Sequence, residues 1–216
     1  MAALDEDRSA WLIQAAVGTL FYMPIVYGLC TALRRGEILA QRWRDIDFGC
    51  SQLSVAQALE QTRDGGLKFK IPKPKRRRTI TMPPFLMEAL TAHREEQAKN
   101  RALFGRDYNA ELDLVIALPD GSPWKPDSFS ASYADFATKL GLKGVRFHGL
   151  RHSHASQLLR QRVPVKTVQE RLGHANATIT LNTYAHVLAG DDRLAVDNFE
   201  LRLRSAIEKQ RARRAN

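Results

Sequence analysis

Nineteen consecutive uncharged residues, at positions 15–33, constrain the fold of this 216-residue chain more than any other feature. A run of this length is long enough to cross a bilayer as a helix. It contains Gly18, Pro24 and Gly28, however, and acidic residues precede it where a signal sequence would carry basic ones. We therefore expect a buried core helix that starts near Ser9, kinks at Pro24 and turns near Gly28, with no membrane contact.

The composition excludes several classes of protein. With 44% hydrophobic residues the chain can form a globular domain with its own core, so it is not a disordered tail. Its two cysteines, Cys30 and Cys50, are too few to frame a disulfide scaffold and form no CxxC pair for zinc. These features are typical of a cytoplasmic protein.

The net charge of +10 is concentrated in two places. Residues 68–78 read KFKIPKPKRRR, with seven basic side chains and no acid, and residues 201–216 carry six basic groups against Glu208. The rest of the chain is nearly neutral. Two basic patches on one domain indicate contacts with a phosphate backbone.

The pattern along the chain predicts an α+β fold, mainly helical, with a small three-stranded antiparallel sheet. The strands are expected at residues 53–57, 68–71 and 78–82, with a turn at 62–66. The helices are expected at 33–41, 84–101 and 127–140, as three short helices within 150–186 with breaks at Pro164 and Gly173, and from Asp192 onward.

Three groups of motifs carry the functional signal. They are TALRRGE at 31–37 with WRDI at 43–46, HGLRH at 148–152 with LGH at 172–174, and NTYAH at 182–186. His174 lies 23 residues beyond Arg151, and Tyr184 lies ten residues beyond His174. In order and spacing these segments resemble the tyrosine recombinase, or phage integrase, family over about residues 10–190.

The resemblance implies a DNA breaking and rejoining fold and a set of catalytic residues around a scissile phosphate. Tyr184 would be the nucleophile, and we expect His148 to accept its proton and His174 to donate a hydrogen bond to the phosphate. Glu37 would support the arginines. The complete set is Arg34, a lysine, His148, Arg151, His174 and Tyr184.

These residue types fit that chemistry on physical grounds. Two guanidiniums supply fixed, always protonated donors for the charge that gathers on the phosphate oxygens. A tyrosine has an ordinary pKa of about 10, so attack near neutral pH needs a proton acceptor and nearby positive charge. The 5′ oxygen is a poor leaving group, and a lysine can protonate it.

The identity of that lysine stays open between two residues. By resemblance it precedes a strand that begins with a basic residue, and counting back from RTI at 78–80 selects Lys73. Here Lys73-Pro74-Lys75 replaces the family's more usual Lys-Thr or Lys-Gly, so Lys75 is the second candidate. Ala32 stands where a glycine is common, which affects local packing only.

Two other functions remain alternatives: a DNA-binding regulator on the same fold that does not cut, and a metal-dependent phosphodiesterase. The presence of every catalytic residue type argues against the first. The second would use His148, His152 and His154, but few carboxylates accompany them. We expect His152, His154 and His186 to be structural, and we expect no metal, nucleotide or other cofactor.

We predict a catalytic domain over residues 1–190 and a basic amphipathic helix over 191–216 that packs on a neighbouring copy. The partners are double-stranded DNA and further copies in a tetrameric synapse, in the cytoplasm of a prokaryotic or phage-type system. By resemblance, an amino-terminal core-binding domain is missing from these 216 residues, so weak, strongly salt-dependent DNA binding is expected. The DNA contacts are expected from Lys68, Lys70, Lys75, Arg76, Arg77 and Arg78.

Overall fold

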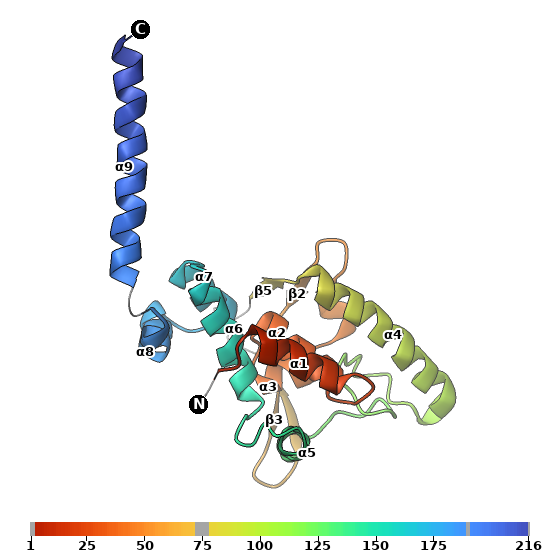
Figure 1. The fold of residues 1–216 in the computed structure, drawn as a ribbon. Coiled ribbons are helices and arrows are strands. Elements are labelled where there is room, and N and C mark those ends of the chain that lie inside the picture. Colours follow the sequence, from red (N-terminus) through yellow and green to blue (C-terminus); the bar gives the residue numbers. More distant parts are fainter. Residues whose placement is uncertain (1–2, 72–77, 189–190, 216) are drawn as a thin grey trace.

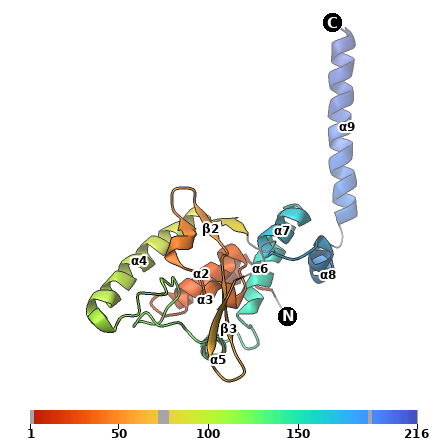
Figure 2. The same ribbon diagram turned by 180° about the vertical axis from the view of Figure 1, so that it is seen from behind.

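A computed structural model describes residues 3–71, 78–188 and 191–215 as a mainly helical body with one long projecting helix (Figures 1 and 2). The helices are α1 (Glu6–Ala16), α2 (Tyr22–Thr31), α3 (Arg35–Leu39), α4 (Pro84–Phe104), α5 (Pro126–Lys139), α6 (His148–Arg160), α7 (Val165–Leu172), α8 (Ala177–Leu188) and α9 (Asp191–Ala215). The strands are β1 (Ile46–Asp47), β2 (Gln52–Ser54), β3 (Ala58–Gln61), β4 (Leu67–Lys70) and β5 (Thr79–Thr81). Single 3-10 turns occur at Trp43–Asp45 and Gly105–Asp107.

The central helix of the body is α2. Its residues from Met23 to Leu29 are all buried, because α1, α3, α4 and α6 pack around it. A helix that is apolar on all sides needs such complete cover. This explains the uncharged run without a bilayer, and no helix in the described part of the chain is both long and apolar enough to span one.

The prediction of a single kinked helix is wrong, because the uncharged run forms parts of two helices with a turn between them. Gly18 has φ +76°, and the Thr19 hydroxyl donates to the Ala16 carbonyl at 2.7 Å, which ends α1. Pro24 then lies in the first turn of α2, where a proline costs no helical hydrogen bond and causes no kink. The turn therefore precedes Pro24.

Gly28 lies inside α2 rather than at the expected turn. A Cβ added at Gly28 would lie 3.3 Å from the Cβ of Leu150 on α6, so the missing side chain lets these two helices approach closely. The contact brings the carboxyl end of α2 next to the face of α6 that carries Arg151.

The α+β fold class is confirmed, although the three-stranded sheet is made of other strands than the expected ones. It runs in the order β1-β2-β5, all antiparallel, while β3 and β4 form a separate hairpin. The expected turn at 62–66 closes that hairpin, with the Thr62 N–H bonded to the Gly66 carbonyl at 2.9 Å. The strand at 67–70 therefore pairs with 58–61 rather than with 79–81.

A second, smaller core lies between α6, α7 and α8. Its buried side chains are Ala32, Ala155, Leu159, Val168, Leu172 and Tyr184. Arg171 fastens this core to the main body, because its guanidinium donates to the carbonyls of Cys30 at 2.6 Å and Thr81 at 3.1 Å. It also donates to Nε2 of His154 at 2.9 Å, while Nδ1 of His154 lies 2.6 Å from the Leu29 carbonyl.

We expect His154 to make the stability depend on pH. Burial, helped by the charge of Arg171, lowers the pKa of His154 in the folded protein to about 4, against about 6.5 when unfolded. The unfolded chain therefore takes up a proton that the native state refuses, so this stability is present above about pH 6.5 and is lost as the pH falls toward 4. The loss for one such histidine is about 3 kcal/mol.

Urea unfolding between about pH 7 and pH 4 measures this loss. The free energy of unfolding should fall less steeply with decreasing pH for His154→Gln than for the unchanged protein. The same slope in both would show that His154 does not contribute.

Candidate active site

The site begins where the chain leaves α2. Ala32 takes a left-handed conformation, φ 57°, which turns the backbone so that Arg34 lies at the start of α3. A non-glycine residue in this region costs about 1 kcal/mol. Ala32 is fully buried, and its carbonyl accepts a hydrogen bond from Nη1 of Arg151 at 2.6 Å.

Glu37 holds two arginines in this site. Its carboxylate accepts from the backbone N–H of Arg34 at 2.8 Å and from Nη1 of the same residue at 3.1 Å. It also accepts a two-point pair from Arg78, at 3.0 and 2.8 Å. Burial alone would raise the pKa of Glu37, but the bonds and charges of Arg78 and Arg34 outweigh it and lower that pKa. Glu37 therefore stays ionised.

The predicted DNA contact of Arg78 suggests an exposed side chain, but the structure buries most of it. Its side chain is only 11% exposed, and besides Glu37 it donates from Nε to the Arg171 carbonyl at 3.1 Å. Arg78 thus connects the start of β5, the start of α3 and the end of α7. Its contact with DNA remains a prediction.

Among the arginines that the structure describes, Arg151 is the most enclosed, at 3% exposure. In addition to the Ala32 carbonyl it reaches the Leu172 carbonyl, 2.7 Å from Nη2, at the carboxyl end of α7. Burial and the nearby Arg34 lower the pKa of Arg151 to about 10, so the guanidinium is still charged at neutral pH. Two helix ends, which carry partial negative charge, therefore hold this cation in place.

Tyr184 on α8 contacts α6 through a histidine. Its side chain is buried, at 2% exposure, and its hydroxyl lies 2.9 Å from Nδ1 of His152. Burial raises the pKa of Tyr184, while Arg151 acts in the opposite direction. His148, one turn earlier on α6, is exposed and stacks edge-on against His152 with ring centroids 5.0 Å apart.

His174 follows the turn after α7. Its Nδ1 lies 2.9 Å from the Thr180 hydroxyl, which leaves Nε2 for another partner, and its carbonyl accepts from Gln169 at 2.7 Å. Burial and the charges of Arg151 and Arg34 lower the pKa of His174 to about 4. It is therefore a neutral hydrogen-bonding group at pH 7 in the free protein.

The structure brings some of the predicted site residues close together and leaves others apart. Arg34 bonds to Glu37 at 3.1 Å and to the Gly173 carbonyl at 3.3 Å, next to His174 in the chain. Arg151 and His174 are close enough to Arg34 for its charge to lower the pKa of both. Lys68 and Lys70 are exposed on β4, where Lys70 pairs with Glu60 at 3.3 Å. The remaining basic candidates lie outside the described residues: Lys73, Lys75, Arg76 and Arg77.

Sequence reasoning missed the contact of His152 with Tyr184 and the anchoring role of Arg171. His152 lies four residues after His148 and therefore on the same helix face, a spacing that signals a shared neighbour. Arg171 gives no comparable signal, because its partners, two backbone carbonyls and the ring of His154, are distant in sequence.

A cleft opens beside this network. Its walls are the start of α3, the β3–β4 hairpin and the end of α7; Arg34, Glu37, Lys70, Arg78 and Gly173 are among the lining residues. The cleft presents the exposed guanidinium of Arg34 next to basic side chains, which suits a phosphate.

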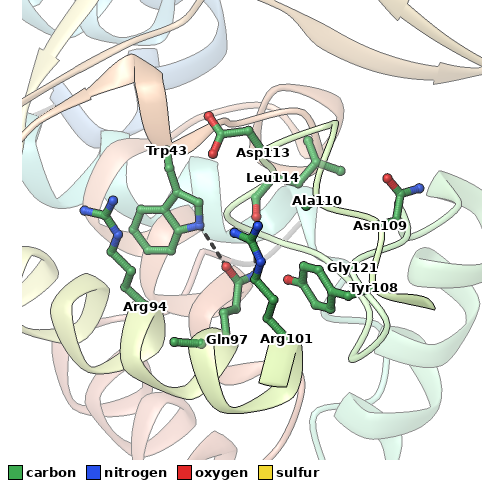
Figure 3. Close-up of a pocket in the computed structure, with 11 residues that line it drawn as sticks. Trp43, Arg94, Gln97, Arg101, Tyr108, Asn109, Ala110, Asp113, Leu114 and Gly121 are labelled. Atoms are coloured by element: carbon green, nitrogen blue, oxygen red, sulfur yellow. Dashed lines mark hydrogen bonds between the residues drawn. The ribbon is translucent and has the colours of Figure 1, made fainter. Parts of the chain in front are cut away.

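A separate hollow lies between α4 and the loop that follows it (Figure 3). Trp43 and Tyr108 line it, together with Arg94, whose guanidinium is 5.4 Å from the centre of the Trp43 ring. The Trp43 indole N–H donates to Gln97 at 2.8 Å. None of the predicted catalytic residues lines this hollow, so it is distinct from the candidate active site.

The fold is shared with solved DNA recombinases. The match with the Tn1549 transposon integrase, solved in complex with a circular intermediate DNA, covers 91% of this chain and 65% of the integrase chain. The TM-score is 0.78 and the sequence identity is 21%. The match with the XerA recombinase covers 94% of this chain and 65% of the XerA chain, with a TM-score of 0.65 and 20% sequence identity. The fold class is therefore that of tyrosine recombinase catalytic domains.

The sequence comparisons give the family. The model of the phage integrase family matches residues 12–190, and the chain belongs to this family. A "Tyrosine recombinase XerC-like" protein of Caldanaerobacter subterraneus subsp. tengcongensis is 34% identical over 178 residues, which cover 77% of this chain and 46% of the relative. The ICEBs1 integrase of Bacillus subtilis is 29% identical over 171 residues, 79% of this chain and 46% of the relative. The chain thus spans about half the length of these curated relatives.

We expect Gly173 to be essential for the position of Arg78. Gly173 has φ +66°, and a Cβ there would lie 2.7 Å from Nη1 of Arg78, which cannot retreat without losing its bonds to Glu37. Gly173→Ala should therefore cost the left-handed strain of about 1–2 kcal/mol plus about 1.5–3 kcal/mol for a lost charged hydrogen bond.

Gly141→Ala is the matched control for this substitution. Gly141 has φ +73°, but a Cβ there would meet no atom within 4 Å, so only the strain is expected. Urea unfolding compares the two variants. Equal losses of unfolding free energy would show that Arg78 moves aside freely.

Proposed function

We propose that this chain is the catalytic part of a site-specific DNA recombinase that cuts and rejoins DNA through a 3′-phosphotyrosyl intermediate. The observation that carries the proposal is the phenol of Tyr184 on α8, held against α6, the helix that carries His148 and Arg151. Membership of the phage integrase family supports it, as do the DNA-bound structures of proteins with the same fold.

In this proposal Arg34 and Arg151 hold the non-bridging oxygens of the scissile phosphate. Arg151 is fixed by two helix-end carbonyls, so its remaining N–H groups keep one direction, and Arg34 is fixed by Glu37 while its side chain stays 46% exposed. Donors that are already oriented need no rearrangement as charge develops during the reaction, which is the main source of electrostatic catalysis. His174 adds a neutral hydrogen bond through Nε2, which has no partner among the described residues.

The chemical step exchanges one phosphodiester for another. The Tyr184 oxygen bonds to phosphorus and loses its proton, the bond from phosphorus to the 5′ oxygen breaks, and that oxygen takes a proton from Lys73 or Lys75. A 5′ hydroxyl of a partner strand then reverses these steps on the intermediate. Both reactions conserve the phosphodiester bond energy, so the proposal requires no nucleotide and no metal ion.

We expect Tyr184→Phe to abolish covalent attachment to DNA, because the phenolic oxygen is the attacking atom. The protein that contains this chain is incubated in EDTA with nicked duplex DNA carrying a verified target site, and protein–DNA adducts are separated on denaturing gels. The unchanged protein should form a protease-sensitive adduct.

Tyr133→Phe is the matched control, since the Tyr133 hydroxyl is also buried but has no hydrogen-bond partner among the described residues. This variant should form the adduct at the normal rate. DNA binding without an adduct by the unchanged protein would favour a non-cutting regulator, and cleavage that requires added metal would favour a phosphodiesterase.

We also propose that copies of the protein assemble on DNA, as a tetrameric synapse in the cytoplasm, through α9. This helix projects away from the body in both views (Figures 1 and 2). Val196, Phe199, Leu203 and Ile207 are each between 44% and 67% exposed, and their spacing of three or four residues puts them on one face. A neighbouring copy would bury this face.

We expect Phe199→Asp to prevent assembly without preventing DNA binding. A charge in the centre of an apolar contact opposes burial of the whole face, so complexes of several copies should decrease at least about tenfold. Leu201→Asp is the matched control, because Leu201 is 74% exposed but lies on the opposite face of α9. Sedimentation of protein–DNA complexes measures the result, and equal assembly by both variants would exclude this face.

A further inference from the structure

In the free protein the side chain of Tyr184 is almost wholly buried in the second core. The side chain is packed with Ala32, Ala155, Leu159 and Leu172 in the second core, and its exposure is 2%. A buried hydroxyl needs an internal partner for its proton. In the described part of the chain that partner is Nδ1 of His152, at 2.9 Å.

The direction of this hydrogen bond follows from the surroundings. The hydroxyl has no other acceptor among the described residues, so it donates and Nδ1 of His152 accepts. Burial lowers the pKa of His152, and Arg151 on the same helix adds to this, so the imidazole is neutral at pH 7 and has a free lone pair. The other described titratable groups that face it are His148, His174 and Tyr184 itself.

His148 is in a different environment. It is exposed, and among the described residues it makes no hydrogen bond with Tyr184 or with any other side chain. A general base must lie within hydrogen-bond reach of the proton it takes. His152 meets this condition in the free protein, whereas His148 faces solvent, where a phosphate would arrive.

We propose that His152, rather than His148, accepts the proton of Tyr184 when its oxygen attacks the DNA phosphate. This inference rests on the proposed recombinase function. The proton passes from the phenolic oxygen to Nδ1 as the bond from that oxygen to phosphorus forms and the bond to the 5′ oxygen breaks. In the rejoining step the histidinium returns the proton to the Tyr184 oxygen as it leaves phosphorus.

The test uses His152→Asn, which separates proton acceptance from simple positioning. The amide oxygen of asparagine can take the place of Nδ1 and accept the same hydrogen bond, but it cannot take up the proton. First-order adduct formation on nicked DNA should slow about a hundredfold or more, as expected for loss of a general base. Thermal unfolding and DNA binding are measured alongside to establish that the variant is folded.

The pH profile provides the second readout. For the unchanged protein, the rate of adduct formation should rise with pH to a plateau, with an apparent pKa below the ordinary histidine value of about 6.5. This rise should be absent in His152→Asn and present in His148→Asn. If His152→Asn does not fold, His148→Asn decides: a retained rise excludes His148 as its source, and a lost rise overturns the proposal.

Each result decides the question. Loss of the rise together with a slow rate supports His152 as the proton acceptor. A normal rate in His152→Asn would reduce His152 to a positioning residue, and a rise that disappears only in His148→Asn would assign the proton to His148. Either result leaves the recombinase function intact, whereas absence of a Tyr184-dependent adduct with the unchanged protein overturns both proposals.

Discussion

Like-charge repulsion among three arginines is the constraint on which the rest of the site depends. Arg34, Arg78 and Arg151 gather around one carboxylate, that of Glu37. A single anion cannot balance three cations, and unpaired buried charge is expensive. The remaining compensation comes from backbone carbonyls at the carboxyl ends of α2 and α7. These carbonyls have no helical partner of their own, so the same bonds satisfy both sides.

This arrangement explains the elements around the site. The left-handed Ala32 and the left-handed Gly173 end their helices where a guanidinium can reach the last carbonyls. Gly28 lets α6 approach α2, and Arg171 fastens α7 to the body. The positive charge left over after this compensation is what a phosphate would neutralise. The free protein thus maintains a cationic site, and in the proposed function the phosphate of DNA would complete it.

The sequence predicted a helix well where it has a clear start or stop, such as Pro84 for α4 and Gly173 for α7. It merged α1 and α2 into one helix, because Gly18 and Thr19 are a weaker stop signal than Pro24. It failed where local signals were weak. A strand of three residues, such as β2, is too short for alternating apolar and polar residues to show which strand it pairs with. The strand at 67–70 was therefore placed in the wrong sheet. Family resemblance named Tyr184, but contacts such as that of His152 depend on how α6 and α8 cross, which a linear spacing does not encode.

In the proposed function the arginines and the histidines would have different chemical roles. Burial lowers the pKa of both His174 and His152, and the charge of Arg151 lowers both further, so both imidazoles are neutral in the free protein. Arginine cannot release its proton near neutral pH, whereas a neutral imidazole can receive one. A bound phosphate would oppose the field of the guanidiniums and raise the basicity of the nearby imidazoles. The site would therefore become a better proton acceptor only once its substrate is in place.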